Sequence, residues 1–300
     1  MANTAVANPH PRLTPAELAQ RHGLKVANDR PPLREYTRQV WAYRHFITAY
    51  SRAKVASSLS NTRLGQLWQV LTPITNAAVY YLIFGVILSQ HRDIENFIAY
   101  LCTGVFVFMF TQTAVANGTS AITTNLGLIR ALHFPRAVLP ITVTLVQLQQ
   151  LLMSMVVLAA IVLVTGEPIT LRWLLLAPVL LLQTIFNIGL TMVMARFGSK
   201  VTDLKQIMPF VLRTWLYASG VLYPVSLIRD HLPDWAATLL EANPALIYIE
   251  LARYALLASN RENLVTTPTR LWGIALAWAL VVGIGGFVYF WRGEKEYGRG

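Results

Sequence analysis

Uncharged polar side chains recur at helical spacing inside the most apolar stretches of the chain. Such amides and hydroxyls exchange hydrogen bonds with sugar hydroxyls, and aromatic rings pack against the C–H faces of a sugar. The alternative use of each stripe is hydrogen bonding between helices, worth about 0.6 kcal/mol per bond. Four stripes together predict a pathway for an uncharged polar ligand. They comprise Gln69, Thr72, Asn76 and Tyr80; Tyr100, Thr103, Thr111 and Gly118; Gln147, Gln150 and Ser154; and Gln183, Asn187 and Thr191.

The chain carries none of the sequence patterns that usually support ATP hydrolysis or metal chemistry. It has no G-x-x-x-x-G-K-[ST] phosphate loop, no H-E-x-x-H pair and no Cys/His metal-ligand spacing. No acid or histidine falls inside the apolar stretches, and Arg213 is the one charged residue well inside them. Proton-coupled carriers and intramembrane enzymes need ionisable groups at such depth. We therefore expect a transport protein that is not an enzyme, with no metal site and no cofactor of its own.

The composition indicates a polytopic membrane protein. Charged residues make up 13% of the 300 residues, against roughly 25% in an ordinary soluble domain. Hydrophobic residues make up 55%, which excludes a disordered chain, a collagen and a typical cytosolic enzyme. The single cysteine, Cys102, excludes a disulfide framework.

Six apolar stretches are long enough to cross the hydrocarbon core, which takes about 20 helical residues. The stretches run over 67–89, 97–123, 137–165, 171–196, 206–228 and 271–291. Eighteen of the 25 Lys and Arg residues flank one side of these spans, and basic residues near spans stay cytoplasmic. Both termini are therefore expected in the cytoplasm. The basic residues behind the formal net charge of +11 therefore serve to orient the chain in the membrane. For this reason we expect no nucleic-acid partner.

The region before the first span divides into two parts. Residues 1–33 are rich in proline and are expected to form a flexible cytoplasmic extension. Residues 34–66 are expected to form an amphipathic helix and a linker before the permease domain at 67–300. Its apolar face comprises Tyr36, Val40, Tyr43, Ile47 and Tyr50, and the residues assigned to the membrane interface are Arg34, Arg38, Trp41 and Arg52. The alternative is a helix that packs on a soluble partner.

The stretch between the fifth and sixth spans contains two apolar segments, 235–240 and 245–258, each too short to cross the membrane. Pro224, Pro233 and Pro244 interrupt it. Short apolar segments broken by proline are typical of re-entrant helices. The predicted fold is thus all-α, with six transmembrane helices, an N-terminal amphipathic interface helix and two short re-entrant extracytoplasmic helices.

Four segments, in this order and spacing, resemble the permease subunits of type-2 ABC exporters. They are Arg63-Leu64-Gly65-Gln66-Leu67-Trp68 followed by Pro73; the loop Asn125 to Pro140; Asp203-Leu204; and Asn243-Pro244 with Arg253. The closest branch exports lipid-linked polysaccharides such as O-antigens, teichoic acids and galactans. The likeness covers about residues 34–300. Thr202 stands where the family usually has Arg, so an ion pair with Asp203 is in doubt.

The resemblance implies a homodimer in the cell membrane with two separate ABC ATPase subunits, which bind the ATP and Mg. The coupling loop to the ATPase would be 125–136, through Leu126, Ile129, Arg130, His133, Phe134 and Arg136. The alternative for this loop is an ordinary positively charged cytoplasmic loop. The extracytoplasmic gate helices would contain Asn243, Pro244, Glu250 and Arg253.

The candidate channel lining combines the polar stripes with residues of the fifth span. It comprises Gln69, Thr72, Asn76, Tyr80, Tyr100, Thr103, Thr111, Arg213, Trp215 and Tyr217. Arg213 would meet a lipid pyrophosphate in the inner leaflet, and the alternative is snorkelling or a structural hydrogen bond.

Two other functions remain open. A type-2 ABC exporter of small lipophilic drugs usually has a large domain after the first span, whereas residues 90–96 form a short loop here. An integral-membrane glycosyltransferase or acyltransferase needs acids or histidines that the spans lack. Arg outnumbers Lys by 20 to 5, which indicates a GC-rich genome and favours the galactan exporters of actinobacterial cell walls.

Overall fold

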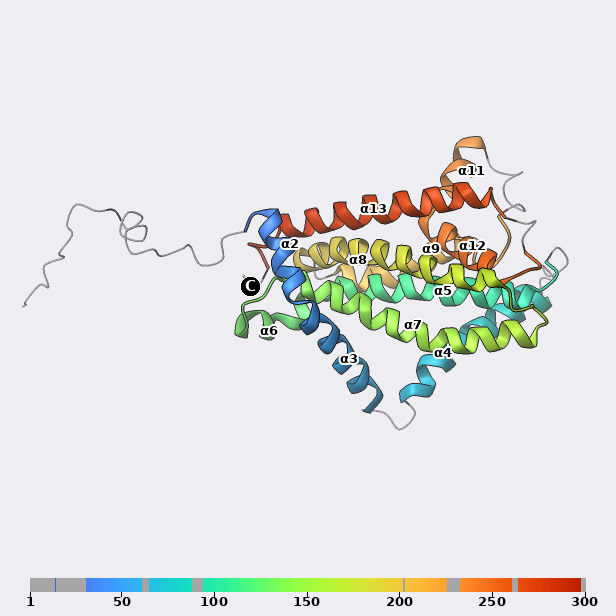
Figure 1. Ribbon diagram of the computed structural model, residues 1–300, viewed down its shortest axis with the longest axis horizontal. Coiled ribbons are helices and arrows are strands. Elements are labelled where there is room, and N and C mark those ends of the chain that lie inside the picture. The colour runs from blue at the N-terminus through green and yellow to red at the C-terminus, as the bar shows by residue number, and fades with distance from the viewer. Residues whose placement is uncertain are drawn as a thin grey trace, which may run out of the picture.

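The computed structural model describes residues 14, 31–60, 65–87, 94–201, 203–225, 233–260 and 264–297, and these ranges are helical with connecting turns. Four long helices run side by side: α5 (Phe97–Thr119), α7 (Val138–Val164), α8 (Leu176–Lys200) and α13 (Pro268–Arg292) (Figure 1). A 3₁₀ turn, η4 (Leu171–Leu175), leads into α8. All four are apolar and long enough to cross a membrane. They confirm the predicted spans over 97–123, 137–165, 171–196 and 271–291.

The first and fifth predicted spans are built differently. α4 (Gly65–Tyr80) continues into the π-helical segment η1 (Tyr81–Ile87), so the predicted span 67–89 is helical as far as residue 87. α9 (Leu204–Tyr217) has 14 residues, or about 21 Å of helix. The span predicted over 206–228 is therefore wrong in length, because the chain turns at Gly220, whose φ of 59° favours glycine. Residues 226–228 lie outside the described ranges, and the count of six spans stays a prediction.

Two short helices precede α13, as the proline-broken stretch predicts. α11 (Asp234–Glu241) follows Pro233, and α12 (Pro244–Leu256) begins at Pro244. The side chain of Asn243 caps α12 by accepting a hydrogen bond from the N–H of Ala245 at 3.1 Å. α12 is almost entirely buried against α5, α8 and α13. The re-entry of these helices into the membrane stays a prediction.

The N-terminal amphipathic segment is divided into two helices, α2 (Leu33–Ala42) and α3 (Arg44–Ser60). The single amphipathic helix predicted within residues 34–66 is wrong in this respect, because Tyr43 leaves helical geometry with ψ near 7°. Its two faces are as predicted, since Tyr36 and Ile47 are buried while Arg34, Arg38 and Arg52 are exposed. The flexible extension predicted over 1–33 lies almost wholly outside the described residues.

α8 and α13 pack with their backbones in close contact. A Cβ atom on Gly189 would overlap the carbonyl oxygen of Val282, and one on Gly286 would overlap that of Gly189. Small residues allow such an approach, and close packing is what holds helices together in lipid. This pair forms the side of the bundle opposite α4 (Figure 1).

The two ends of the bundle differ in composition. One end carries α2, α3, the C-terminal tail and the short helix α6 (Leu126–Ala131), which follows the 3₁₀ turn η3 (Thr123–Asn125) (Figure 1). The other end carries α11 and α12. The predicted coupling loop and interface helix therefore lie at one end, and the predicted gate helices at the other.

Candidate functional site

The second and fourth polar stripes face each other inside the bundle. The amide of Gln183 in α8 donates to the carbonyl of Val107 at 2.9 Å and to the hydroxyl of Thr111 at 3.1 Å, both in α5. Gly118 lies directly against Thr191. Tyr100, Thr103 and Thr111 are each at most 2% exposed. In this conformation Gln183 makes the interhelical hydrogen bonds that were the alternative to a pathway, whereas the side chains of Thr103, Asn187 and Thr191 are buried without a hydrogen-bond partner within the described residues.

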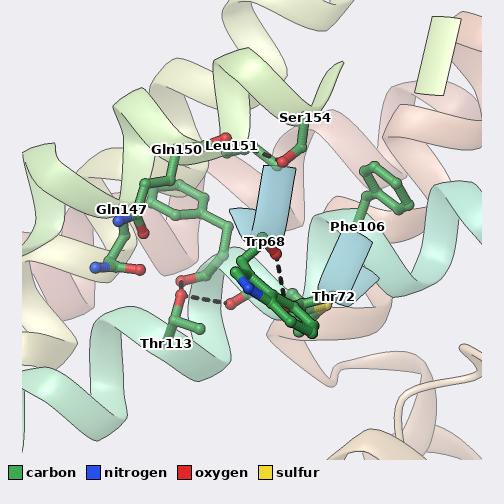
Figure 2. Close-up of a pocket in the computed structure, with 10 residues that line it drawn as sticks. Trp68, Thr72, Phe106, Thr113, Gln147, Gln150, Leu151 and Ser154 are labelled. Atoms are coloured by element: carbon green, nitrogen blue, oxygen red, sulfur yellow. Dashed lines mark hydrogen bonds between the residues drawn. The ribbon is translucent and has the colours of Figure 1, made fainter. Parts of the chain in front are cut away.

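Thr72 of the first stripe and all three residues of the third stripe instead line a pocket between α4, α5 and α7, which we call the α4–α7 pocket (Figure 2). Its volume is about 310 Å³. The lining residues are Trp68, Thr72, Phe106, Met109, Phe110, Thr113, Gln147, Gln150, Leu151 and Ser154. The side chain of Gln69, from the predicted list, lies outside the described part of the structure.

The polar groups of this pocket are uncharged and largely available to a ligand. Gln147 is 8% exposed, and neither its side-chain amide nor that of Gln150 forms a hydrogen bond within the described residues, although the backbone carbonyl of Gln150 accepts one from Ser154 at 3.1 Å. Each amide therefore offers two donors and one acceptor. The hydroxyls of Thr72 and Thr113 donate to carbonyls of their own helices, both at 2.7 Å, and their oxygens remain free to accept.

Aromatic rings complete the pocket. Phe106 and Phe110 are buried in α5, whereas Trp68 is 55% exposed and stands beside Thr72 on α4 (Figure 2). Flat apolar surfaces next to unpaired amides suit a ligand with both C–H faces and hydroxyl groups. The lining residues include no acid, histidine or cysteine.

The other candidate lining residues of α4 and α9 come together at the bundle surface. Tyr80 is half-buried and lies close enough to Tyr217 and Arg213 to interact electrostatically with both. Arg213, Tyr217 and Asn76 are exposed. The structure thus places predicted residues of the first and fifth spans on one face.

Trp215 and the predicted gate residues fix the connection between α9 and α12. The Trp215 indole donates to the Asn243 side chain at 3.0 Å, and that amide donates to the carbonyl of Ala218 at 2.8 Å. The guanidinium of Arg253, at 0% exposed, donates to Glu250 and to the carbonyl of Gly220, both at 2.9 Å.

Arg253 also binds the residues that precede α12. It donates to the carbonyl of Val221 at 3.0 Å, and its guanidinium carbon lies 3.3 Å from the ring centroid of Tyr100. With Pro244 as the first residue of α12, the gate residues form a rigid buried joint. A gating role for this joint stays a prediction.

The predicted coupling loop rests on the interface helices. Phe134 packs on Phe46 with ring centroids 6.2 Å apart, and the Tyr43 hydroxyl donates to the carbonyl of His133 at 3.1 Å. Leu126 and Ile129 are half-buried in the same apolar cluster. Arg130 and His133 are exposed, as is the neighbouring Leu132. The loop therefore presents a mixed basic and apolar tip beyond the end of the bundle.

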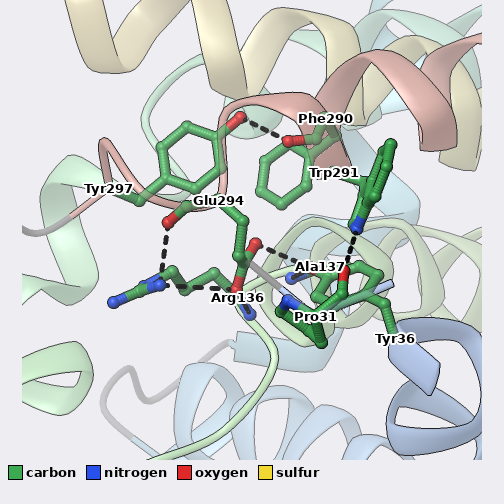
Figure 3. Close-up of polar contacts among 8 residues, drawn as sticks. All are labelled: Pro31, Tyr36, Arg136, Ala137, Phe290, Trp291, Glu294 and Tyr297. Carbon is green, nitrogen blue, oxygen red and sulfur yellow. Dashed lines mark hydrogen bonds and ion pairs between the residues drawn. The ribbon is translucent and has the colours of Figure 1, made fainter. Parts of the chain in front are cut away.

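A buried carboxylate ties this loop to α2 and to the C-terminal tail (Figure 3). Glu294 is 5% exposed and accepts hydrogen bonds from the Tyr36 hydroxyl at 2.7 Å and from the backbone N–H of Arg136 at 2.9 Å. The Arg136 guanidinium lies 3.5 Å from the carboxylate and donates to the carbonyl of Glu294 at 2.8 Å. The N–H of Ala137 donates to the Tyr36 hydroxyl at 3.1 Å.

The electrostatics of this cluster follow from its burial. Burial raises the pKa of Glu294 above its ordinary 4.5, although hydrogen bonds from Arg136 and Tyr36 work in the opposite direction. Burial and the adjacent carboxylate also raise the pKa of Tyr36, which therefore stays protonated and donates. Glu294 is thus a fixed acceptor that joins three segments.

Sequence reasoning missed Glu294, and it placed Gln147 and Gln150 in a polar stripe without including them in the candidate channel lining. Glu294 stands in a short charged tail with no periodic signal around it. The two glutamines were visible as a stripe, but spacing cannot say which neighbouring helix a stripe faces. Trp68 was named in the sequence only as the last residue of the motif that begins at Arg63.

Comparisons with known proteins agree on one family. The family model described as ABC-2 type transporter matches residues 46–257. The chain is 30% identical over 193 residues to an O-antigen export system permease protein RfbA of Myxococcus xanthus, covering 64% of this chain and 74% of the relative. It is 25% identical over 209 residues to the polysialic acid transport protein KpsM of Escherichia coli, covering 68% and 78%. An RfbA of Klebsiella pneumoniae is 25% identical over 181 residues, covering 60% and 68%.

Proposed function

The chain belongs to the ABC-2 type transporter family, and from this premise we propose that it is the permease subunit of an ABC exporter of polysaccharide in the cell membrane. The substrate is a lipid-linked glycan, either a cell-wall galactan or an O-antigen-like glycan. The names of the relatives, which concern O-antigen and polysialic acid, support a polysaccharide. Both termini face the cytoplasm, as the distribution of basic residues predicts.

The α4–α7 pocket is the observation that carries this proposal. A sugar unit needs donors, acceptors and flat apolar faces without charge, and the pocket offers the amides of Gln147 and Gln150 beside the ring of Trp68. When a ligand displaces water from an amide and offers no hydrogen bond in return, the free energy of the bound state rises. A small lipophilic drug would leave both amides unpaired, so the pocket favours the glycan.

The α4–α9 face supports a homodimer with the pathway between its two copies. We use this name for the exposed surface of the two helices, whose apolar side chains include Leu71 at 45%, Val79 at 50% and Phe210 at 77% exposed in the single chain. Tyr80 of α4 interacts electrostatically with Arg213 and Tyr217 of α9. A second copy of the chain would cover the apolar residues and leave the polar ones beside the path of the glycan.

Two ABC ATPase subunits, which bind ATP and Mg, complete the exporter. The tip of the coupling loop, with Arg130, Leu132 and His133 exposed, is the surface on which they dock. Because Glu294 fixes the base of this loop to α2, a push on the loop is carried into the membrane part of the subunit.

The proposal is tested with the complex purified from membranes through a tag on this chain. We expect an ABC ATPase to copurify and its ATP hydrolysis to rise when a lipid-linked glycan is added. The double variant Gln147→Leu/Gln150→Leu should weaken that response about tenfold or more. Gln149→Leu is the matched control, because Gln149 donates to Ser51 at 2.9 Å and does not line the pocket.

Three results would contradict the proposal. An equal glycan response in the pocket variant and the control would remove the role of the pocket. Stimulation by lipophilic drugs but not by glycans would favour a drug exporter. Product formation by the purified chain without an ATPase would favour a membrane glycosyltransferase.

A further inference from the structure

A second hollow lies on the other side of the bundle, under α2 and between α8 and α13. We call it the α2 groove. Leu33 and Thr37 of α2 form its upper edge, Ile188 of α8 and Phe287 of α13 form its walls, and Gly283 forms part of its floor. Its volume is about 410 Å³ and its lining is almost entirely apolar. None of its lining residues belongs to the α4–α7 pocket.

The groove is elongated along the direction of the spanning helices. Its α13 residues extend from Ala279 to Val288, which corresponds to about 13 Å at 1.5 Å per residue. Its α8 residues extend over 185–192, or about 10 Å. A hollow of this shape, at the membrane depth of two spanning helices, matches an extended acyl chain.

Basic side chains stand along one edge of the groove. At 100° per residue, Arg34 and Arg38 lie next to Leu33 and Thr37 on the surface of α2. Both are exposed, and neither forms a hydrogen bond or ion pair within the described residues. The acid of α2, Glu35, lies on the side of the helix away from Leu33 and Thr37, three residues before Arg38, and accepts a hydrogen bond from Gln39 at 3.3 Å.

An interfacial tryptophan extends the same edge. Trp41 is 69% exposed, and the Arg44 guanidinium lies 5.4 Å from the centroid of its ring. Trp at the level of the lipid headgroups, with Arg beside it, is typical of the membrane interface. The edge therefore offers three guanidinium groups at the depth where a lipid phosphate would lie.

The position of α2 over the groove is fixed. The Tyr36 hydroxyl is hydrogen-bonded to Glu294 at 2.7 Å, and the Tyr36 ring packs on Phe287 with centroids 5.7 Å apart. The indole of Trp291 donates to the carbonyl of Pro31 at 2.9 Å just before α2 begins. Because these contacts hold α2 in place over the groove, the site is preformed before a lipid binds.

We propose that the α2 groove binds an anionic glycerophospholipid, with one acyl chain in the groove and the phosphate held by Arg34 and Arg38. The apolar lining binds the acyl chain of the lipid, and the two arginines favour a headgroup with a net negative charge. Binding needs neither the ATPase nor the glycan, so this site stands or fails independently of the proposed export function.

Native mass spectrometry of the full-length chain tests the proposal. The probes are phosphatidylglycerol and phosphatidylcholine with identical acyl chains. We expect one phosphatidylglycerol to bind about 25-fold more tightly than phosphatidylcholine, since each of the two arginines near an anionic lipid contributes about fivefold. The preference should shrink as salt is raised, which can be measured on the unmodified chain.

Two variants separate the parts of the site. Arg34→Gln/Arg38→Gln should lower phosphatidylglycerol binding to the level of phosphatidylcholine, while Lys205→Gln/Arg270→Gln removes the same charge from exposed positions outside α2 and should change nothing. Thr37→Trp places a bulky side chain over the groove and should weaken the binding of both lipids.

Several outcomes would overturn the proposal. Equal binding of the two lipids by the unmodified chain would do so, as would an unchanged preference in Arg34→Gln/Arg38→Gln. Lipid binding that appears only after residues 1–30 are removed would assign the groove to that segment. If the α2 groove is inaccessible to solvent in a purified lipid-free dimer, a second copy of the chain occupies it instead of a lipid.

Discussion

Replacing Tyr36 with Phe tests whether the Glu294 cluster holds the interface helix and the coupling loop together. The change removes one hydroxyl and keeps the ring that packs on Phe287. It takes a donor from the Glu294 carboxylate and an acceptor from the N–H of Ala137. Tyr36 is 1% exposed, so water has little access to the groups that lose their partners.

The magnitude follows from these two losses. A hydrogen bond to a charged group contributes about 1.5–3 kcal/mol, and a buried group left without its partner costs about 1–3 kcal/mol. We expect a loss of about 3 kcal/mol in the free energy of unfolding, which lowers the melting temperature by about 6 °C or more. Tyr43→Phe is the control, because its hydroxyl makes a single exposed bond to His133, worth about 1 kcal/mol.

The loss should depend on pH, because burial raises the pKa of Glu294 above 4.5. Between 4.5 and that raised pKa the folded protein binds more protons than the unfolded chain, so the free energy of unfolding falls as pH rises through this window. Glu294→Gln should remove this dependence. Tyr36→Phe should cost less at pH 5 than at pH 8, since a neutral carboxyl accepts a weaker hydrogen bond.

The assay is thermal unfolding of the purified chain in one detergent at pH 5 and pH 8, with Tyr36→Phe, Glu294→Gln and the double variant. The two changes should be non-additive, because both remove the same bond. Melting of Tyr36→Phe within 1 °C of Tyr43→Phe, or strict additivity in the double variant, would refute the reasoning.

Three further predictions concern single side chains. Arg213→Gln should slow glycan export without lowering the melting temperature, since Arg213 is exposed; unchanged export would remove its proposed contact with a lipid pyrophosphate. Arg253→Met should cost about 3–5 kcal/mol, because Glu250 is left buried without its cation; a normal melting temperature would contradict this. Gly189→Leu should separate α8 from α13 and abolish the peak of the folded protein in gel filtration, whereas Gly127→Leu, with open space around it, should not.

Local sequence determined the helices and their faces. Runs such as 97–123 and 137–165 are so apolar that only a helix with all its backbone bonds satisfied fits them in a membrane. The alternation of Tyr36 and Ile47 with Arg34 and Arg38 correctly assigned the two faces of the interface region. These features depend on spacing along one helix, which a sequence displays directly.

The partners of each stripe were decided by tertiary structure alone. The same kind of polar spacing became an interhelical contact at Gln183 and an open pocket at Gln147. Which of these occurs depends on whether the helix opposite brings an acceptor or leaves a gap. No pattern within one helix contains that information.

The break at Tyr43, the early end of α9 and the role of Glu294 have a related cause. α12 is buried against α5, α8 and α13. Its Arg253 binds the carbonyls of Gly220 and Val221, which lie in the turn after the end of α9. Glu294 is buried because α2 and the coupling loop meet over the tail. The sequence by itself determined which segments are helical, and its basic residues predict how these segments are oriented in the membrane. The three-dimensional packing decided where those helices stop and which polar groups stay open to a ligand, because distant segments supply or withhold the missing hydrogen-bond partners.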